Sequence, residues 1–88
     1  MKGRTLVAWN LRRLRTERGL TQTQLATDAG VDHVHVGALE REIKSATVDF
    51  LDKLAAALDV PIADFFEVPT RGEKRPGGLK SGRKPSSK

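Results

Sequence analysis

The stretch from residue 22 to residue 41 constrains the fold most strongly, because two short apolar patterns there flank a single glycine. Each pattern has the three- and four-residue spacing of an amphipathic helix, so each predicts one apolar stripe. The apolar positions are Leu25, Ala26, Ala29, Val31, Val36 and Leu39. Gly30, between the patterns, can adopt a positive φ angle without steric cost, which a sharp turn between helices requires. The pattern therefore predicts two short helices packed against each other, with Ala26 where their backbones approach.

Length and composition limit the possible classes of protein. A chain of 88 residues forms one small domain at most. No apolar run approaches the roughly 18 residues of a membrane span, and no signal-peptide core is present at the N-terminus. Cysteine is absent, which excludes a disulfide framework, a thiol nucleophile and a cysteine zinc site. We expect a cytoplasmic protein with no membrane partner.

Positive charge is concentrated at the end of the chain. The net charge is +5, yet residues 1–68 contain nine basic and ten acidic residues, whereas residues 69–88 contain seven basic and one acidic residue. The last segment is also rich in Pro, Gly and Ser, with Leu79 as its one large apolar residue. Such a composition cannot bury enough apolar surface to fold. We expect a folded domain over residues 1–68 and a basic, disordered tail over residues 69–88 that can contact phosphates without sequence preference.

Periodicity predicts an all-α domain. Five helices are expected, over about residues 6–18, 22–29, 33–41, 48–58 and 61–66. Side chains that can cap a helix N-terminus precede four of them: Thr5, Thr21, Asp32 and Thr47. Thr21 and Gln24 have the spacing of a capping box, and Pro61 suits the first turn of the last helix.

From about Val7 to Phe66 the chain resembles the Xre/Cro-type helix-turn-helix family, which includes phage repressors and restriction–modification controller proteins. The resemblance is carried by Leu11-Arg12-Arg13-Leu14-Arg15, Arg18-Gly19-Leu20-Thr21-Gln22, Leu25-Ala26, Gly30-Val31, Val36, Leu39-Glu40-Arg41, residues 54–61, and Phe65-Phe66. These motifs follow in the family's order. The resemblance implies a compact, five-helix, lambda-repressor-like domain whose third helix enters the major groove of DNA.

The resemblance also implies roles for individual residues. Base contacts fall on His33, Val34, Gly37 and Ala38; phosphate contacts fall on Thr21, Gln22, His35, Arg41 and Lys44. Helical spacing places Val34, Ala38 and Arg41 opposite the apolar stripe of the third helix. The exposed N–H groups at the start of the second helix favour an anion whatever the side chain. Arg15 and Glu40 correspond to the family's structural ion pair between the first and third helices.

Two positions depart from the family pattern. Gly37 lies inside the third helix, where glycine costs about 0.5–1 kcal/mol relative to alanine, so a packing or docking reason is expected. Glu42 stands where the family usually has a glycine, which predicts a longer third helix. With Val34, Gly37 and Ala38, the base-reading face offers mainly apolar contacts.

An apolar cluster near the end of the domain predicts an interface between two copies of the chain. Ile62, Phe65 and Phe66 are more apolar than a one-turn helix needs for its own packing. Trp9 lies off the stripe of the first helix, so its ring is expected either to be partly covered by the last helix or the tail, or to join this interface.

No catalytic or metal-binding set is apparent. His33 and His35 are two residues apart and do not share a helix face, so neither a metal nor another cofactor is expected. No nucleophile or second acid accompanies Glu40, so no enzyme is expected. The sequence predicts a DNA-binding transcriptional regulator, a repressor that binds a two-fold symmetric operator as a homodimer and takes no small-molecule ligand. A restriction–modification controller and an antitoxin-like protein-interaction module are the alternatives.

Overall fold

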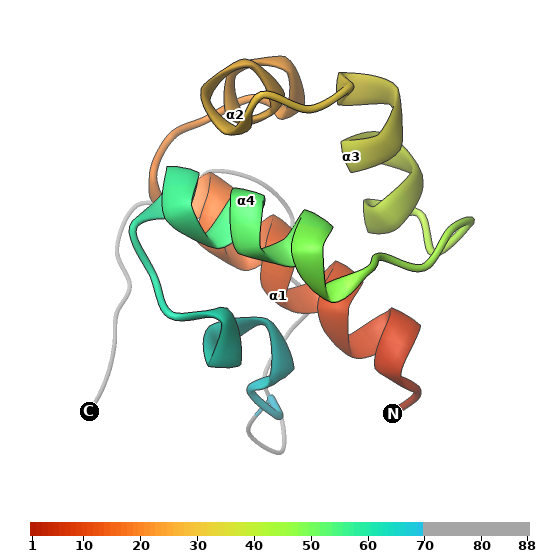
Figure 1. Ribbon diagram of the computed structural model, residues 1–88. Helices are drawn as coiled ribbons and strands as arrows, with labels where there is room; N and C mark the ends of the chain where they lie inside the picture. The colour runs from red at the N-terminus through yellow and green to blue at the C-terminus, as the bar shows by residue number, and fades with distance from the viewer. Residues whose placement is uncertain (70–88) are drawn as a thin grey trace.

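Four α-helices and one short 3-10 helix form the part of the chain that the structure, a computed structural model, describes, residues 1–69. They are α1 (Gly3–Glu17), α2 (Gln22–Ala29), α3 (His33–Glu40), α4 (Val48–Leu58) and the 3-10 helix η1 (Ile62–Phe66) (Figure 1). The all-α prediction is confirmed, but the fifth helix is a 3-10 helix rather than an α-helix. The expected tail, beyond residue 69, lies outside the described residues.

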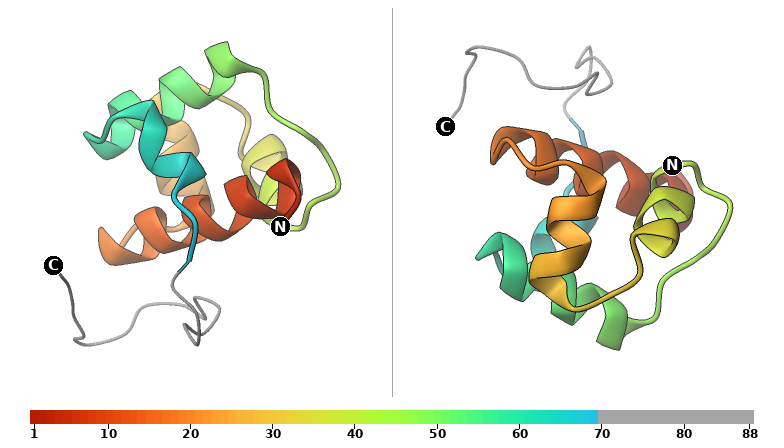
Figure 2. Two further views of the ribbon diagram at one scale, coloured as in Figure 1. Left: turned by 90° about the horizontal axis from the view of Figure 1, so that it is seen from below. Right: turned by 90° about the horizontal axis from the view of Figure 1, so that it is seen from above.

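The long helix α1 lies between two groups of elements. It contacts α3 on one side and η1 on the other, while α2 packs against α3 and α4. Seen from below, η1 lies over α1, and seen from above, α2 and α3 lie in front (Figure 2). The elements that resemble a helix-turn-helix and the end of the domain therefore occupy different sides of α1.

The core is built from the apolar stripes of these helices. It includes Leu11, Leu25, Val36, Leu54, Leu58 and Phe65, each essentially inaccessible to solvent. Leu25 and Val36 come from the two patterns that flank Gly30, so the predicted stripes do face each other. No helix within residues 1–69 is long and apolar enough to cross a membrane.

Three of the four predicted N-caps are present. The Thr21 hydroxyl accepts a hydrogen bond from the Gln24 N–H (3.0 Å), and the Gln24 amide oxygen accepts one from the Thr21 N–H (2.8 Å). Asp32 and Thr47 cap α3 and α4 by accepting one hydrogen bond each, from the N–H groups of Val34 and Phe50. The prediction for Thr5 is wrong, because α1 begins at Gly3 and Thr5 lies inside its first turn.

Two residues next to the helix-turn-helix have a left-handed backbone conformation: the one that ends α2 and one in the loop after α3. Gly30 has a φ angle of 72°, as the tight turn requires. Glu42 has a φ angle of 62°, so it adopts the glycine-like conformation at this position although it carries a side chain. The expected lengthening of α3 is therefore wrong: the helix ends at Glu40, and Glu42 turns the chain away.

Candidate nucleic-acid interface

A buried carboxylate joins α3 to α1. The Glu40 side chain is inaccessible to solvent, and its two oxygens accept hydrogen bonds from Arg15 Nε (2.6 Å) and Nη2 (3.0 Å). Arg15 Nη1 also donates to the Leu20 carbonyl, which lies just before α2 (2.7 Å). The bidentate geometry limits how α3 can rotate or slide on α1. The structure thus contains the ion pair expected from the sequence.

Two further side chains converge on the same carboxylate. Gln22 Nε2, at the start of α2, donates to Glu40 Oε1 (3.0 Å), and Arg12 Nε lies 3.5 Å from that oxygen. Glu40 therefore connects α1, α2 and α3. The sequence indicated one of these partners and missed the other two, because side chains from different helices meet at a point that no local spacing encodes.

The start of α2 presents backbone donors to solvent. Thr21 is exposed and its hydroxyl is occupied by the cap, while the Gln22 side chain points inward to Glu40. The first N–H groups of a helix have no carbonyl partner within the helix. An anion bound here would therefore meet backbone N–H groups. The side-chain Nε2 of Gln22 is not available to it, because this atom is bonded to Glu40.

The four residues expected to read bases fall into two groups. His33 and Val34 are exposed at the start of α3, where the Val34 side chain retains 60% of its accessible surface. Gly37 is buried beneath neighbouring side chains. The outward placement of Ala38 is wrong: it is 5% exposed. Ala38 lies where the following loop folds back, with the Ile43 N–H bonded to its carbonyl (2.9 Å), so its methyl group is covered.

The prediction that His35 faces a phosphate does not match its position. Its ring stacks on Phe50 of α4, with ring centroids 4.0 Å apart, and its buried Nε2 has no hydrogen-bond partner in the described part of the chain. An aromatic ring packed between two helices cannot reach DNA without leaving that contact. No group of three or more potential metal ligands occurs within residues 1–69.

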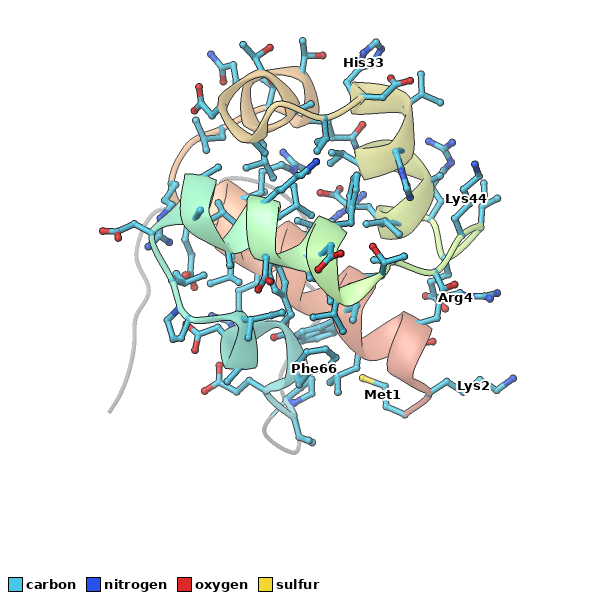
Figure 3. All side chains as sticks on the ribbon, viewed as in Figure 1. Met1, Lys2, Arg4, His33, Lys44 and Phe66 are labelled. Carbon is cyan, nitrogen blue, oxygen red and sulfur yellow. The ribbon has the colours of Figure 1, made fainter. Side chains whose placement is uncertain are left out.

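Basic side chains line one edge of the molecule beside α3. Arg41 and Lys44 are exposed after the end of α3. Figure 3 shows Lys44, Arg4 and Lys2 along the same edge, with His33 at its upper end. The Thr5 hydroxyl donates to Glu42 Oε1 (2.6 Å) and so ties the start of α1 to the loop after α3.

The residues expected to join two copies of the chain are not equally accessible. Phe65 is completely buried in the core of its own chain, so its assignment to an interface is wrong. Ile62 is half-buried and packs against that core. Phe66 remains 44% exposed and lies on the lower face with Met1, far from His33 in this view (Figure 3).

Asn10 holds this end of the domain in place and carried no signal in the sequence. Its side chain is buried, and Nδ2 donates to the carbonyls of Phe65 (2.8 Å) and Glu67 (2.9 Å). Arg13 Nη2 donates to Asn10 Oδ1 (3.1 Å) and to Glu67 Oε1 (2.9 Å). A neutral amide on a helix has no characteristic spacing to its partners, so only the folded chain reveals this role.

Comparison with known proteins agrees with this arrangement. The family model described as helix-turn-helix matches residues 11–65. An uncharacterized HTH-type transcriptional regulator of Sinorhizobium fredii, y4dJ, is 36% identical over 80 residues, covering 91% of this chain and all of the relative. A hypothetical transcription factor of Neisseria meningitidis is 37% identical over 57 residues, or 65% of this chain and 54% of the relative.

The chain thus spans about half the length of the Neisseria relative that it matches. Among solved structures, the restriction–modification controller protein C.AhdI of Aeromonas hydrophila superposes with a TM-score of 0.69 at 36% identity, covering 72% of this chain and 96% of the controller. The matched residues contain α2, Gly30 and α3 together with the buried Glu40. The chain therefore belongs to the helix-turn-helix family, of the Xre/Cro type.

Proposed function

We propose that this protein is a sequence-specific transcriptional regulator that places α3 in the major groove of DNA. The observation that carries the proposal is the buried Glu40, which bonds to α1 and α2 and so holds α3 rigidly while His33 and Val34 stay exposed. A helix that reads bases must be held in one orientation, because base discrimination depends on fixed geometry at the groove floor. The names of the relatives, which describe transcriptional regulators, support the same function.

Phosphate contacts fit the two flanks of α3. On one flank lie the backbone N–H groups at the start of α2, and on the other lie Lys44 and Arg4. Helix N-termini and lysine or arginine side chains are the usual partners of phosphate oxygens. Basic residues of the segment beyond residue 69 would add affinity without sequence preference.

The proposed regulator acts as a homodimer on a two-fold symmetric operator, as a repressor. Phe66 and Val68 are large apolar side chains left exposed at the end of the domain, 44% and 74% respectively, and Met1 lies on the same face. An interface there keeps α3 free in both copies. Two recognition helices would then contact half-sites about 34 Å apart on one side of the duplex.

Selection of binding sites from a random DNA pool tests sequence-specific binding. We expect enrichment of one palindromic sequence and binding that weakens as salt rises. His33→Ala should weaken binding to the selected site by about 1–3 kcal/mol through one base pair in each half-site. Lys53→Ala, on the exposed side of α4, is the matched control and should leave the preference unchanged. A pool with no enriched sequence would contradict the proposal and favour the antitoxin-like module.

Analytical ultracentrifugation tests the dimer. Phe66→Ser should shift the free protein toward monomer, because it removes a large apolar side chain from the proposed interface. Ala63→Ser, an exposed neighbour in η1, should not. A parent protein that remains monomeric at high micromolar concentration, both free and on its selected site, would refute this part of the proposal.

A role as a restriction–modification controller is a narrower form of the same function. It is favoured by the structural similarity to the controller C.AhdI, with a TM-score of 0.69. If it is correct, the selected site should occur upstream of a neighbouring endonuclease or methyltransferase gene. A selected site found only at unrelated promoters would exclude it.

A further inference from the structure

α3 has a gap in its surface where Gly37 lacks a side chain, and the side chains of Gln22 and Arg41 fill this gap. Residue 37 is glycine, and a Cβ atom placed there would lie 3.1 Å from Gln22 Oε1 and 3.2 Å from Arg41 Nη1. Both distances are shorter than ordinary van der Waals contacts of a methyl group. Glycine inside a helix is unfavourable, so the close approach of these two side chains provides the packing reason for it.

Arg41 is directed along α3 rather than away from it. It follows the last residue of α3, four positions after Gly37, and side chains of a helix lean toward its N-terminus. The guanidinium therefore lies back over Gly37, close to the helix backbone. The ion pairs within residues 1–69 involve other basic groups, so no carboxylate in this part of the chain holds the guanidinium.

Gln22 limits the space on the other side of the gap. Its Nε2 is bonded to the buried Glu40, which leaves its Oε1 facing Gly37. On one side of the gap, Gln22 is fixed by its hydrogen bond to Glu40. On the other side lies the flexible, positively charged side chain of Arg41. Of the neighbours on the outward face of α3, Val34 provides only apolar contact.

We propose that Arg41 is a specificity-determining residue that reads a guanine in the major groove, and that Gly37 makes room for it. This inference rests on the proposed function and assigns Arg41 to a base rather than to a phosphate. The planar guanidinium has donors in the spacing of guanine O6 and N7, which makes arginine the commonest partner of that base. A phosphate contact needs neither a missing side chain nor a guanidinium lying along the helix.

Chemical substitution of the DNA gives a direct test. The parent protein is first used to select its site, and each guanine of the half-site is then replaced by 7-deazaguanine, which lacks the N7 acceptor. At one guanine we expect the parent to lose about tenfold to a hundredfold in affinity, since a bidentate base contact has that value. Arg41→Met has a side chain of similar length but no hydrogen-bond donor, so the same DNA substitution should change its affinity by less than threefold.

Gly37→Ala tests the gap itself. The added methyl group must displace Arg41 or Gln22, so the preference for the guanine should fall while α3 remains helical, because alanine is a better helix former than glycine. A melting temperature equal to or above that of the parent will show that the fold is intact. Lys44→Ala is the matched comparison: loss of a phosphate contact should weaken all DNA sequences alike and reduce the salt dependence.

The possible results separate the two levels of inference. If Arg41→Met selects the same sequence as the parent and loses as much affinity on 7-deazaguanine, Arg41 does not read that base and the inference is wrong. If the parent selects a site in which no guanine responds to the substitution, the inference is also wrong, although the proposed function stands. If the parent selects no site, both fail.

Discussion

The elements α3 and η1 both pack against α1, but different interactions hold them: a buried ion pair for α3, and a buried amide and an aromatic ring for η1. α3 is attached by the buried Glu40 carboxylate and the Arg15 guanidinium, a charged pair with bidentate geometry. η1 is attached by a buried neutral amide, Asn10, and by the fully buried ring of Phe65, and the charged pair of Arg13 and Glu67 just after it is largely exposed. Each attachment supports one proposed surface, the DNA-reading helix in the first case and the dimer interface in the second.

This difference shows what each surface requires. A recognition helix needs one orientation, and several directional bonds to one carboxylate provide it. The last carbonyls of a helix have no partner within it, so those at the end of the five-residue η1 need an external donor, and its ring needs a place in the core. The charged attachment sets an angle, whereas the neutral one satisfies polar groups while apolar burial stabilises the contact.

Removal of the charged attachment should have the largest effect. Glu40→Ala leaves Arg15 half-buried without its carboxylate and releases Gln22, so we expect a loss of about 3–5 kcal/mol in the free energy of unfolding. Urea unfolding monitored by circular dichroism measures it. Glu17→Ala, which removes an exposed partner of Arg13, should cost less than about 1 kcal/mol. Equal losses for the two variants would show that the Glu40 cluster does not hold α3.

Removal of the neutral attachment should have a smaller effect. Asn10→Ala leaves the carbonyls of Phe65 and Glu67 without this donor, which should cost about 1–3 kcal/mol. Compared with the parent, the variant should show faster amide hydrogen exchange in η1, whereas exchange in α2 should change less. Lys53→Ala, on the exposed side of α4, is the control and should leave exchange in η1 near the parent value. Unchanged exchange in the Asn10 variant would indicate that Phe65 alone anchors η1.

The turn between α2 and α3 tests how much the protein depends on the left-handed backbone conformation of Gly30. Gly30 has a φ angle of 72°, and apart from its neighbours in the chain nothing described lies within 4 Å of a Cβ placed there. Gly30→Ala should therefore destabilise the protein by about 1–2 kcal/mol through backbone strain alone. Thermal unfolding measures this loss. A variant as stable as the parent would mean that the turn relaxes to another conformation, which the affinity for DNA would then reveal.

The turn into η1 should give the smallest change, with the opposite sign. Asp59 ends α4 with a φ angle of 59°, in the same left-handed region but with a side chain present. Asp59→Gly removes that strain at the cost of greater freedom in the unfolded chain, and a net gain of about 0.5 kcal/mol is expected. The same thermal measurement applies. A clear loss would show that the Asp59 side chain stabilises the turn.

Local chemistry allowed much of the fold to be predicted from the sequence. Interactions between residues a few positions apart produce the capping box at Thr21, the turn at Gly30 and the apolar stripes around Leu25 and Val36. These features can therefore be predicted from the amino-acid sequence. The pair of Arg15 and Glu40 was expected only through the family resemblance. The wrong predictions concern burial: helical period gives the direction of a side chain but does not say which other element covers it.

The sequence by itself determined the four α-helices, three of their N-caps, the glycine turn and the family of the protein. Tertiary structure alone decided that Ala38, His35 and Phe65 are covered, that Asn10 holds the end of the domain, and that Arg41 lies over Gly37. The reason is physical. Local structure depends on hydrogen bonds and torsion angles within a few residues, whereas exposure and the meeting of distant side chains depend on how whole helices pack.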